Sequence, residues 1–192
     1  LFEKSSLKCD VIAHGAIIGG YLENGLPTQA MQVFGQMQQR GVKPDRVIIL
    51  STLKAISTLE WLHEGRLLHV LILINGFESE ISVLNTLIDM YAKCGSLEDA
   101  KRVFDAVLTR DVFLWNTMIA VYGQAEELKE ALHLFEIMQR ENKVLADVVT
   151  FVTMLDACAG KVALVEGKIV HTIVSSHGFE KDVIICNAAI NL

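Results

Sequence analysis

Asparagine and aspartate residues recur along this chain in a pattern that bears on hydrogen-bonding chemistry. Asn85, Asn116 and Asn187 occupy corresponding places, 31 and 71 residues apart, and Asp111 and Asp147 follow the first two. An asparagine amide carries both a donor and an acceptor, so it could hydrogen-bond a ligand with a mixed polar edge. The same residues could instead stabilise helix termini, with asparagine as an N-cap and aspartate near the positive end of the next helix. Both interpretations stay open at this point.

Residues that could catalyse a reaction or bind a metal do not fall into a working arrangement. His63-Glu64 begins like an HExxH zinc motif, but the next histidine is His69, about 240° further around a helix, so the two imidazoles could not share a metal. The four cysteines show no CxxC spacing, and we find no phosphate-binding glycine loop, nucleophile elbow or deaminase signature. We therefore expect no catalytic residue, metal, cofactor or small-molecule substrate, and we predict that the chain is not an enzyme.

A helical hairpin must position the asparagine and aspartate side chains, and it is clearest over residues 81–111. From Leu84 onward, apolar residues follow the i, i+3, i+4, i+7 spacing of a helix with one buried stripe. Gly95 favours the left-handed turn that ends this helix. Ser96 can cap a second helix, with Asp99 three residues later, and its apolar stripe ends at Phe104.

This hairpin repeats along the whole chain. Units of one kind recur every 101 or 102 residues, so the true period is a triplet of three unit types, and such repetition is typical of a solenoid. We therefore predict an all-α, superhelical solenoid of helix–turn–helix repeats, with ten helices in five hairpins, partial helices at both ends and no strand. The predicted units are residues 1–10 (tail of a short unit), 11–45 (standard), 46–80 (long), 81–111 (short), 112–147 (standard), 148–182 (long) and 183–192 (start of a short unit).

The repeat resembles a known family. The segment NTLIDMYAKCGSLEDAKRVFD at residues 85–105 is similar to the short motif of pentatricopeptide repeat proteins, in the land-plant subfamily that cycles standard, long and short motifs. DVFLWNTMIAVYGQ at residues 111–124 resembles the standard motif, and VVTFVTMLDACA at residues 148–159 resembles the long one. The resemblance implies a single-stranded RNA-binding array, in a mitochondrial or chloroplast factor for RNA editing or processing. Other organellar editing factors are further partners that it implies.

In this family the fifth and last residues of each motif together contact one base. The resemblance therefore implies that Asn85 with Asp111, and Asn116 with Asp147, each read uridine. Asn187 would be a third fifth-position residue, whose last-position partner lies beyond residue 192.

The other expected RNA-facing positions are weaker. Three units have non-reading residues at the fifth position: Gly15 with Asp45, Leu50 with Glu80, and Val152 with Asp182. Lys93 stands where the family has a lysine that contacts phosphate. The resemblance further implies that second-position residues sandwich the bases, although ordinary core or helix-entry residues could also occupy these places; the residues are Ile12, Val47, Ser82, Phe113, Val149 and Ile184.

Charge and length leave alternatives open. The net charge of −6 is unusual for a nucleic-acid binder, because phosphate neutralisation normally supplies much of the affinity. A helical scaffold that binds a protein partner is therefore the alternative, and a C-terminal deaminase domain in a longer parent protein is a third possibility that this sequence does not test.

No apolar run reaches the roughly 18 residues of a membrane span, so we expect no membrane partner. We also expect this chain to be an excerpt of a longer protein.

Overall fold

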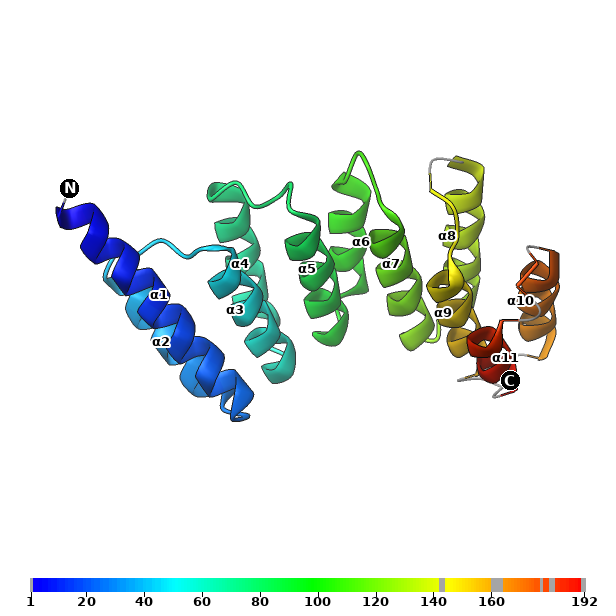
Figure 1. Ribbon diagram of the computed structural model, residues 1–192, viewed down its shortest axis with the longest axis horizontal. Coiled ribbons are helices and arrows are strands. Elements are labelled where there is room, and N and C mark those ends of the chain that lie inside the picture. The colour runs from blue at the N-terminus through cyan, green and yellow to red at the C-terminus, as the bar shows by residue number, and fades with distance from the viewer. Residues whose placement is uncertain (1, 142–143, 160–163, 177, 180–181, 191–192) are drawn as a thin grey trace. The chain divides into compact units, whose positions relative to one another are not determined.

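The computed structural model describes residues 2–141, 144–159, 164–176, 178–179 and 182–190, which form eleven α-helices and no strand (Figure 1). Helices α1 to α10 form the five predicted hairpins, and α11 is the first helix of a further unit. The all-α prediction is therefore confirmed. The helices are α1 (Phe2–Glu23), α2 (Pro27–Gln39), α3 (Arg46–Leu59), α4 (Leu62–Ile74), α5 (Ile81–Lys93), α6 (Leu97–Ala106), α7 (Val112–Gln124), α8 (Leu128–Glu141), α9 (Val148–Ala159), α10 (Leu164–Ser176) and α11 (Val183–Ile190).

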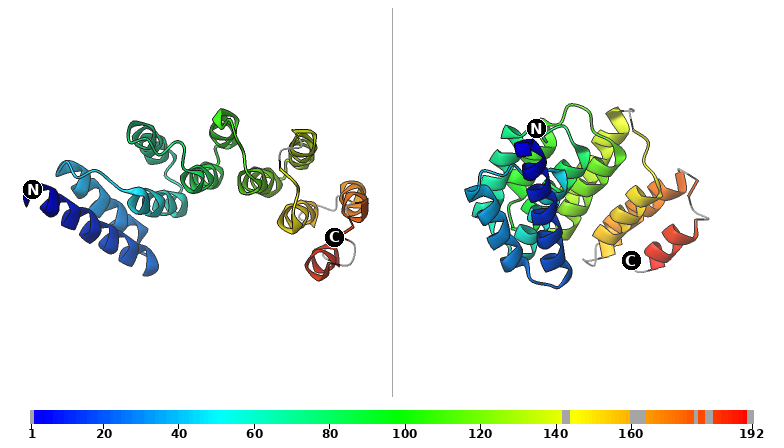
Figure 2. Two further views of the ribbon diagram at one scale, coloured as in Figure 1. Left: turned by 45° about the horizontal axis from the view of Figure 1, so that its top comes forward. Right: turned by 60° about the vertical axis from the view of Figure 1, so that its left-hand side comes forward.

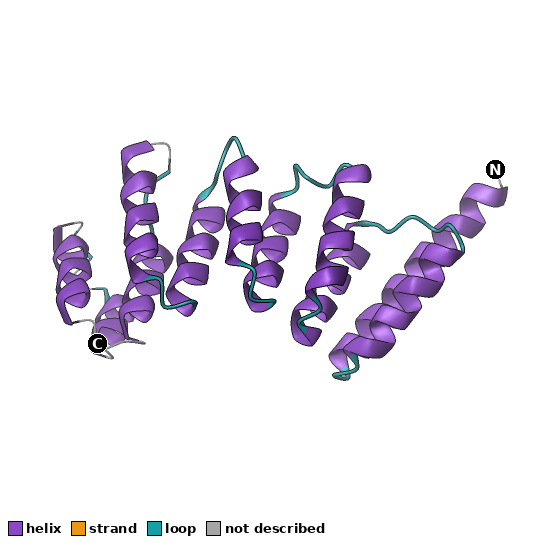
Figure 3. Ribbon diagram, turned by 180° about the vertical axis from the view of Figure 1, so that it is seen from behind, coloured by secondary structure: helices purple, strands orange, loops and turns teal. Residues whose placement is uncertain are grey.

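The chain divides into two compact units, residues 1–103 and residues 104–192. In the first unit α1 packs against α2 and α3, and α3 packs against α4 and α5; in the second, α7 packs against α8 and α9, and α9 against α10 and α11. Within each unit, therefore, the first helices of successive hairpins lie side by side. Figure 2 shows the paired helices from two further directions, and Figure 3 shows the short loops that join them.

The hairpin at residues 81–111 illustrates why these sequences fold in this way. The apolar stripe of α5 is buried, with Leu87 and Ile88 fully inaccessible to solvent. Gly95 follows the helix with φ of 75°, and the Ser96 N–H donates to the Tyr91 carbonyl at 2.8 Å, which closes the turn. Helix α6 then begins at Leu97, as the sequence predicts.

The turn inside each of four hairpins uses a left-handed residue at one fixed place, the fifteenth of the unit. Gly25 and Gly95 have φ of 70° and 75°, and the equivalent Glu60 and Glu126 have φ of 54° and 62°. Glycine adopts this conformation without a Cβ penalty, whereas a glutamate there costs about 1–2 kcal/mol. The backbone geometry of the repeat therefore holds even where the sequence does not supply the usual glycine.

The N-terminal boundary differs from expectation. The predicted units place a break between Asp10 and Val11, but α1 runs through this point from Phe2 to Glu23. Residues 1–10 contain neither glycine nor proline, so no local signal ends a helix there. From Arg46 onward, by contrast, α3, α5, α7, α9 and α11 each begin at the first residue of a predicted unit. The assignment of these units as standard, long or short stays a prediction.

Candidate nucleic-acid interface

The second unit brings together one predicted pair, Asn116 and Asp147. Asn116 lies in the fifth position of α7 and is 7% exposed, while Asp147 immediately precedes α9. The Asn116 Nδ2 donates a hydrogen bond to the Asp147 Oδ1 at 3.3 Å. Because an ionised carboxylate only accepts hydrogen bonds, the amide nitrogen must face it. The Asn116 Oδ1 therefore points away from Asp147.

This amide oxygen is the most unusual polar atom of the pair. The Asn116 Oδ1 is buried and has no hydrogen-bond partner, and the same holds for the Asn85 Oδ1 in the first unit. An unpaired buried acceptor costs roughly 1–3 kcal/mol, and a ligand that supplies a donor recovers this free energy. Since both oxygens are shielded from solvent, a ligand reaches them only after neighbouring side chains move.

Asp147 is held by several bonds. Its Oδ1 accepts from the Thr150 backbone N–H at 2.8 Å and from the Thr150 hydroxyl at 2.9 Å, in addition to Asn116. Burial alone would raise the pKa of Asp147, but these hydrogen bonds hold it below its ordinary value of 3.8. Asp147 is therefore a carboxylate throughout the neutral range.

The aspartates that close the units also cap the following helices. The Asp45, Asp111 and Asp147 carboxylates each accept from the backbone N–H three residues later, at 2.9, 2.9 and 2.8 Å, and Asp182 accepts from the Ile184 N–H at 2.9 Å. The capping interpretation is thus right for aspartate. For asparagine it is wrong, because Asn85, Asn116 and Asn187 lie four residues inside α5, α7 and α11, past the positions that need a cap.

The remaining predicted pairs differ from Asn116 and Asp147. Asn85 lies in the first unit and Asp111 in the second, so their pairing stays a prediction. Asn187 is exposed on α11. In the first unit, a Cβ on Gly15 would lie 3.4 Å from Ile48, and the Glu80 carboxylate lies 3.6 Å from the Arg46 guanidinium. Leu50 and Val152 are half-buried and carry no polar group.

The second-position residues lie at the surface. Five of them are large apolar side chains with 56–66% of their area exposed, and Ser82 is exposed as well. None of them contributes to the core, so they are not ordinary core residues. Five of the six are, however, the second residue of a helix, as the helix-entry alternative expects. Apolar side chains this open are available for van der Waals contact with a ligand, and the Phe113 ring also for stacking; the five are Ile12, Val47, Phe113, Val149 and Ile184.

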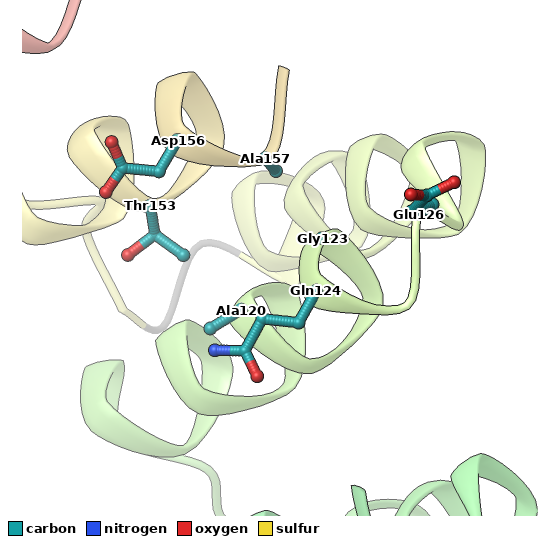
Figure 4. Close-up of a pocket in the computed structure, with 7 residues that line it drawn as sticks. All are labelled: Ala120, Gly123, Gln124, Glu126, Thr153, Asp156 and Ala157. Carbon is teal, nitrogen blue, oxygen red and sulfur yellow. The ribbon is translucent and has the colours of Figure 1, made fainter. Parts of the chain in front are cut away.

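Clefts run between neighbouring first helices in both units. In the first unit a cleft of about 400 Å³ lies between α3 and α5, and its polar rim includes Lys54, Lys93 and Asp89. The Lys93 Nζ lies 2.8 Å from the Asp89 carboxylate. In the second unit a cleft of about 330 Å³ lies between α7 and α9. Figure 4 shows its lining, in which the described residues include acidic but no basic side chains: Ala120, Gly123, Gln124, Glu126, Thr153, Asp156 and Ala157.

Histidine does not form a metal site in the part of the chain that the structure describes, where no group of three or more potential ligands gathers. His69 instead packs edge-on against Tyr91, and its Nδ1 lies 2.9 Å from the Tyr91 hydroxyl. Burial lowers the pKa of His69 and raises that of Tyr91 to about 12. Both groups are therefore neutral near pH 7 and serve the packing of α4 against α5. None of the helices described combines the length and apolar character of a membrane span.

Comparison with known proteins decides the family. A model of the PPR repeat matches residues 12–42 and 82–112, and a model of the PPR repeat family matches residues 110–160, so the matches together cover more than half of the chain. The chain belongs to the pentatricopeptide repeat family. A chloroplastic pentatricopeptide repeat-containing protein of Arabidopsis thaliana is 35% identical over 95% of this chain and 22% of its own length. A putative mitochondrial one from the same plant is 35% identical over 94% of this chain and 29% of its own length.

Solved structures support the same fold. The pentatricopeptide repeat protein PPR10 from maize superposes with a TM-score of 0.76 at 18% identity, covering 94% of this chain and 26% of PPR10. PPR10 in complex with an 18-nt psaJ RNA element gives a TM-score of 0.74 at 19% identity, covering 94% of this chain and 27% of PPR10. The fold of this chain is therefore the all-α solenoid of helix–turn–helix repeats. The chain spans about a quarter of the length of these pentatricopeptide repeat proteins.

Sequence reasoning missed one residue of this interface. Thr150 holds Asp147 with two side-chain hydrogen bonds, although it occupies neither the fifth nor the last place of a pentatricopeptide repeat. A signal was present, because Thr150 stands where the other units have aliphatic residues such as Ile48 and Leu114. A lone hydroxyl at a core position is a reason to look for a hydrogen bond to the preceding aspartate.

Proposed function

We propose that this chain is a base-specific, single-stranded RNA-binding segment of a longer plant organellar pentatricopeptide repeat protein. Asn116 with Asp147, and Asn85 with Asp111, each read one uridine. The observation that carries the proposal is the unpaired, buried Oδ1 of Asn116, whose amide is oriented by Asp147. The matched PPR10 structure was solved in complex with RNA, which agrees with this class of ligand.

The chemistry of the oriented amide favours uracil. Its Oδ1 lacks a donor, and the uracil N3–H is one; its Nδ2 can also donate to the neighbouring uracil O4. The cytosine N3 is an acceptor and would face the Asn116 Oδ1 without a bond, which leaves the buried oxygen unpaired. Asp147 supports this choice because a carboxylate cannot donate to the Oδ1 and can only hold the Nδ2. The pair therefore distinguishes uracil from cytosine by presenting the Asn116 amide oxygen, and not its nitrogen, to N3 of the base.

Several further properties belong to the proposal. The exposed second-position residues, such as Phe113 and Val149, contact the faces of the bases. Lys93 contacts phosphate at the cleft between α3 and α5. The segment has no catalytic role of its own, and it acts in a chloroplast or mitochondrion in RNA editing or processing, together with other editing factors. A helical scaffold for a protein partner is less well supported, because it does not explain why the amide oxygens of Asn85 and Asn116 are buried without a hydrogen-bond partner.

The test is a change of base preference at one nucleotide. Single-stranded RNA is selected from a randomised pool on the wild-type chain at low salt, and affinities are then measured by fluorescence anisotropy with each uridine replaced in turn. Replacing a uridine that is read should weaken binding by about 10-fold or more, on the scale of 1–3 kcal/mol for a base-edge contact. The Asn116→Thr variant should move the preference at one nucleotide from U to G, as the family's code implies.

Asn24→Thr is the matched control, because Asn24 lies at the surface and its amide donates only to the Gly20 carbonyl, at 2.7 Å. This variant should bind as the wild type does. If Asn116→Thr weakens binding to all sequences equally, with no change of preference, the uridine reading by Asn116 is wrong. If no RNA is selected from the pool at all, the RNA-binding proposal fails, and the helical scaffold for a protein partner becomes the better-supported function.

A further inference from the structure

The third residue of the units has one exception to an apolar rule. This position is buried in five units, with at most 2% exposure, and it lies three residues after the residue that closes the preceding unit. A hydroxyl in such a place is costly unless it is hydrogen-bonded. Four of these residues are aliphatic and one is threonine: Ile48, Val83, Leu114, Thr150 and Ile185.

The Thr150 hydroxyl both accepts and donates a hydrogen bond, and both bonds are to Asp147. It accepts from the Asp147 backbone N–H at 3.1 Å and donates to the Asp147 Oδ1 at 2.9 Å. The Thr150 backbone N–H donates to the same oxygen at 2.8 Å. Thr150 therefore forms hydrogen bonds with both the backbone and the side chain of Asp147. Asp45 and Asp111 have an aliphatic residue in this place, and each receives a single backbone hydrogen bond from it.

These bonds continue to the base-reading amide. The Oδ1 that Thr150 holds is also the atom that receives the Asn116 Nδ2. If that oxygen turned away, the Asn116 amide could rotate by 180° and present its nitrogen where its oxygen now lies. A rotated amide would offer a donor in place of an acceptor, and would match the cytosine N3 instead of the uracil N3–H.

We propose that Thr150 is a positioning residue for base recognition, which fixes the Asp147 carboxylate and through it the orientation of the Asn116 amide. This inference rests on the proposed reading of uridine by Asn116 and Asp147. The inference extends to other repeats: a threonine at the third position of one unit would sharpen base recognition by the unit before it. It also predicts that the pair at Asn116 discriminates U from C more sharply than Asn85 with Asp111, since Asp111 is followed by Leu114.

A simple capping role makes a different prediction. If the hydroxyl only stabilised the start of α9, its loss would weaken the fold and lower RNA affinity for every sequence alike. The two roles are separated by the ratio of affinities for RNAs that differ in one base, which a uniform loss of folded protein leaves unchanged.

The experiment replaces Thr150 with valine, which keeps the shape and removes the hydroxyl, and with serine, which keeps the hydroxyl. Affinities are measured for the selected RNA and for the same RNA with cytidine at the nucleotide that responds to Asn116→Thr. Thr150→Val should lower the preference for U over C by about 3- to 10-fold, the scale of one lost hydrogen bond. Thr150→Ser should retain the preference. Thr172→Val is the matched control, since the exposed Thr172 hydroxyl donates only to the Lys168 carbonyl, at 2.8 Å.

A second measurement tests the positioning without RNA. The chemical shift of the Asp147 carboxyl carbon is followed by NMR against pH in each variant. The pKa of Asp147 should rise towards its ordinary value in Thr150→Val but not in Thr150→Ser. An unchanged U-over-C ratio in a folded Thr150→Val chain would overturn the inference, as would an unchanged Asp147 pKa. If the wild type itself shows no preference for U, the proposed function fails, whereas the titration still decides whether Thr150 holds Asp147.

Discussion

The cleft between α3 and α5 in the first unit and the cleft between α7 and α9 in the second occupy the same register of the repeat but carry opposite charge. The ninth residue on the first helix of each cleft is Lys54 in one and Ala120 in the other. The ninth residue on the second helix is an aspartate in both, Asp89 and Asp156. Only Asp89 has a lysine beside it on its own helix, at 2.8 Å. The first cleft is therefore suited to phosphate, and the second repels it.

The polar side chains outside the two clefts form networks of different kinds. In the first unit they lock helices together: Arg66 donates to the Asp99 carboxylate at 2.8 Å, and the Ser96 hydroxyl donates to the same oxygen at 2.8 Å. In the second unit hydrogen bonds run from Thr150 through Asp147 to Asn116, whose Oδ1 is unpaired, as is the Asn85 Oδ1 of the first unit. Concentrating the phosphate contacts at the first cleft reconciles the proposed RNA binding with a net charge of −6.

The largest effect is expected from the charges of the clefts. The Lys54→Gln/Lys93→Gln double variant should bind the selected RNA about 10-fold more weakly near 0.1 M salt, because two phosphate neutralisations are lost. The slope of log affinity against log salt should become shallower by about 0.7 for each lysine.

Asp156→Asn should act in the opposite direction and raise affinity by about 2- to 3-fold, since it removes a repulsive charge from the second cleft.

None of these three substitutions should alter the preference for U over C, because phosphate contacts position the RNA and base contacts specify it. Anisotropy titrations at several salt concentrations measure both quantities in one series. A double lysine variant with unchanged affinity and salt slope would mean that the RNA backbone does not follow the first cleft, and the contrast between the clefts would lose its functional meaning.

A smaller effect is expected from the Asp99 network, which belongs to the first unit. Burial alone would raise the pKa of Asp99, but hydrogen bonds from Arg66 and Ser96 and the charges of Arg66 and Arg102 hold it below 3.8. A lowered folded-state pKa contributes stability that is complete above the unfolded value and is lost as pH falls through the folded value. The first unit should therefore lose stability below about pH 4, and Asp99→Asn should remove about 1 kcal/mol at pH 7 and flatten this dependence.

The two tryptophans allow the units to be followed separately. Trp61 lies at the start of α4 in the first unit and Trp115 in the core of the second, so single-tryptophan chains report urea midpoints for each. Asp99→Asn should shift the Trp61 midpoint more than the Trp115 midpoint. Equal shifts at both would indicate that the two units unfold together, and would remove the basis for treating their polar networks as independent.

The sequence predicted those features that depend on local chemistry repeated many times. The apolar stripe of α5, the turn at Gly95 and the start of each first helix from Arg46 onward all follow from spacing and helix-stop signals. The missing break at Asp10 shows the limit, since a boundary inferred from repeat alignment alone has no local signal to enforce it. The position of Asp147 as a helix cap was open from the sequence, because capping and base reading use the same residue type.

Side-chain hydrogen bonds over longer distances could not be predicted in this way. The Arg66 contact with Asp99 joins residues 33 positions apart, and nothing in either local sequence specifies the other. The Asn116 pairing with Asp147 was expected only through the family resemblance, not from local spacing. The charge contrast between the clefts depends on which residues two separate helices present to one another. For Thr150 a signal existed, but its meaning required the neighbouring carboxylate to be located.

The smallest effect, and one that should be alike in both units, concerns the left-handed turn position. Glu60 in the first unit and Glu126 in the second have φ of 54° and 62°, where glycine is favoured. Glu60→Gly and Glu126→Gly should each stabilise the chain by about 0.5–1 kcal/mol, because relief of the left-handed strain exceeds the entropy that glycine adds to the unfolded state. Gly95→Glu should destabilise it by a similar amount, and since a Cβ there meets no atom within 4 Å, the loss would be one of backbone conformation. Urea unfolding followed by circular dichroism measures all three. If Glu126→Gly stabilises the chain while Glu60→Gly does not, interactions of the Glu60 side chain offset its strain, and the turns of the two units differ as their clefts do.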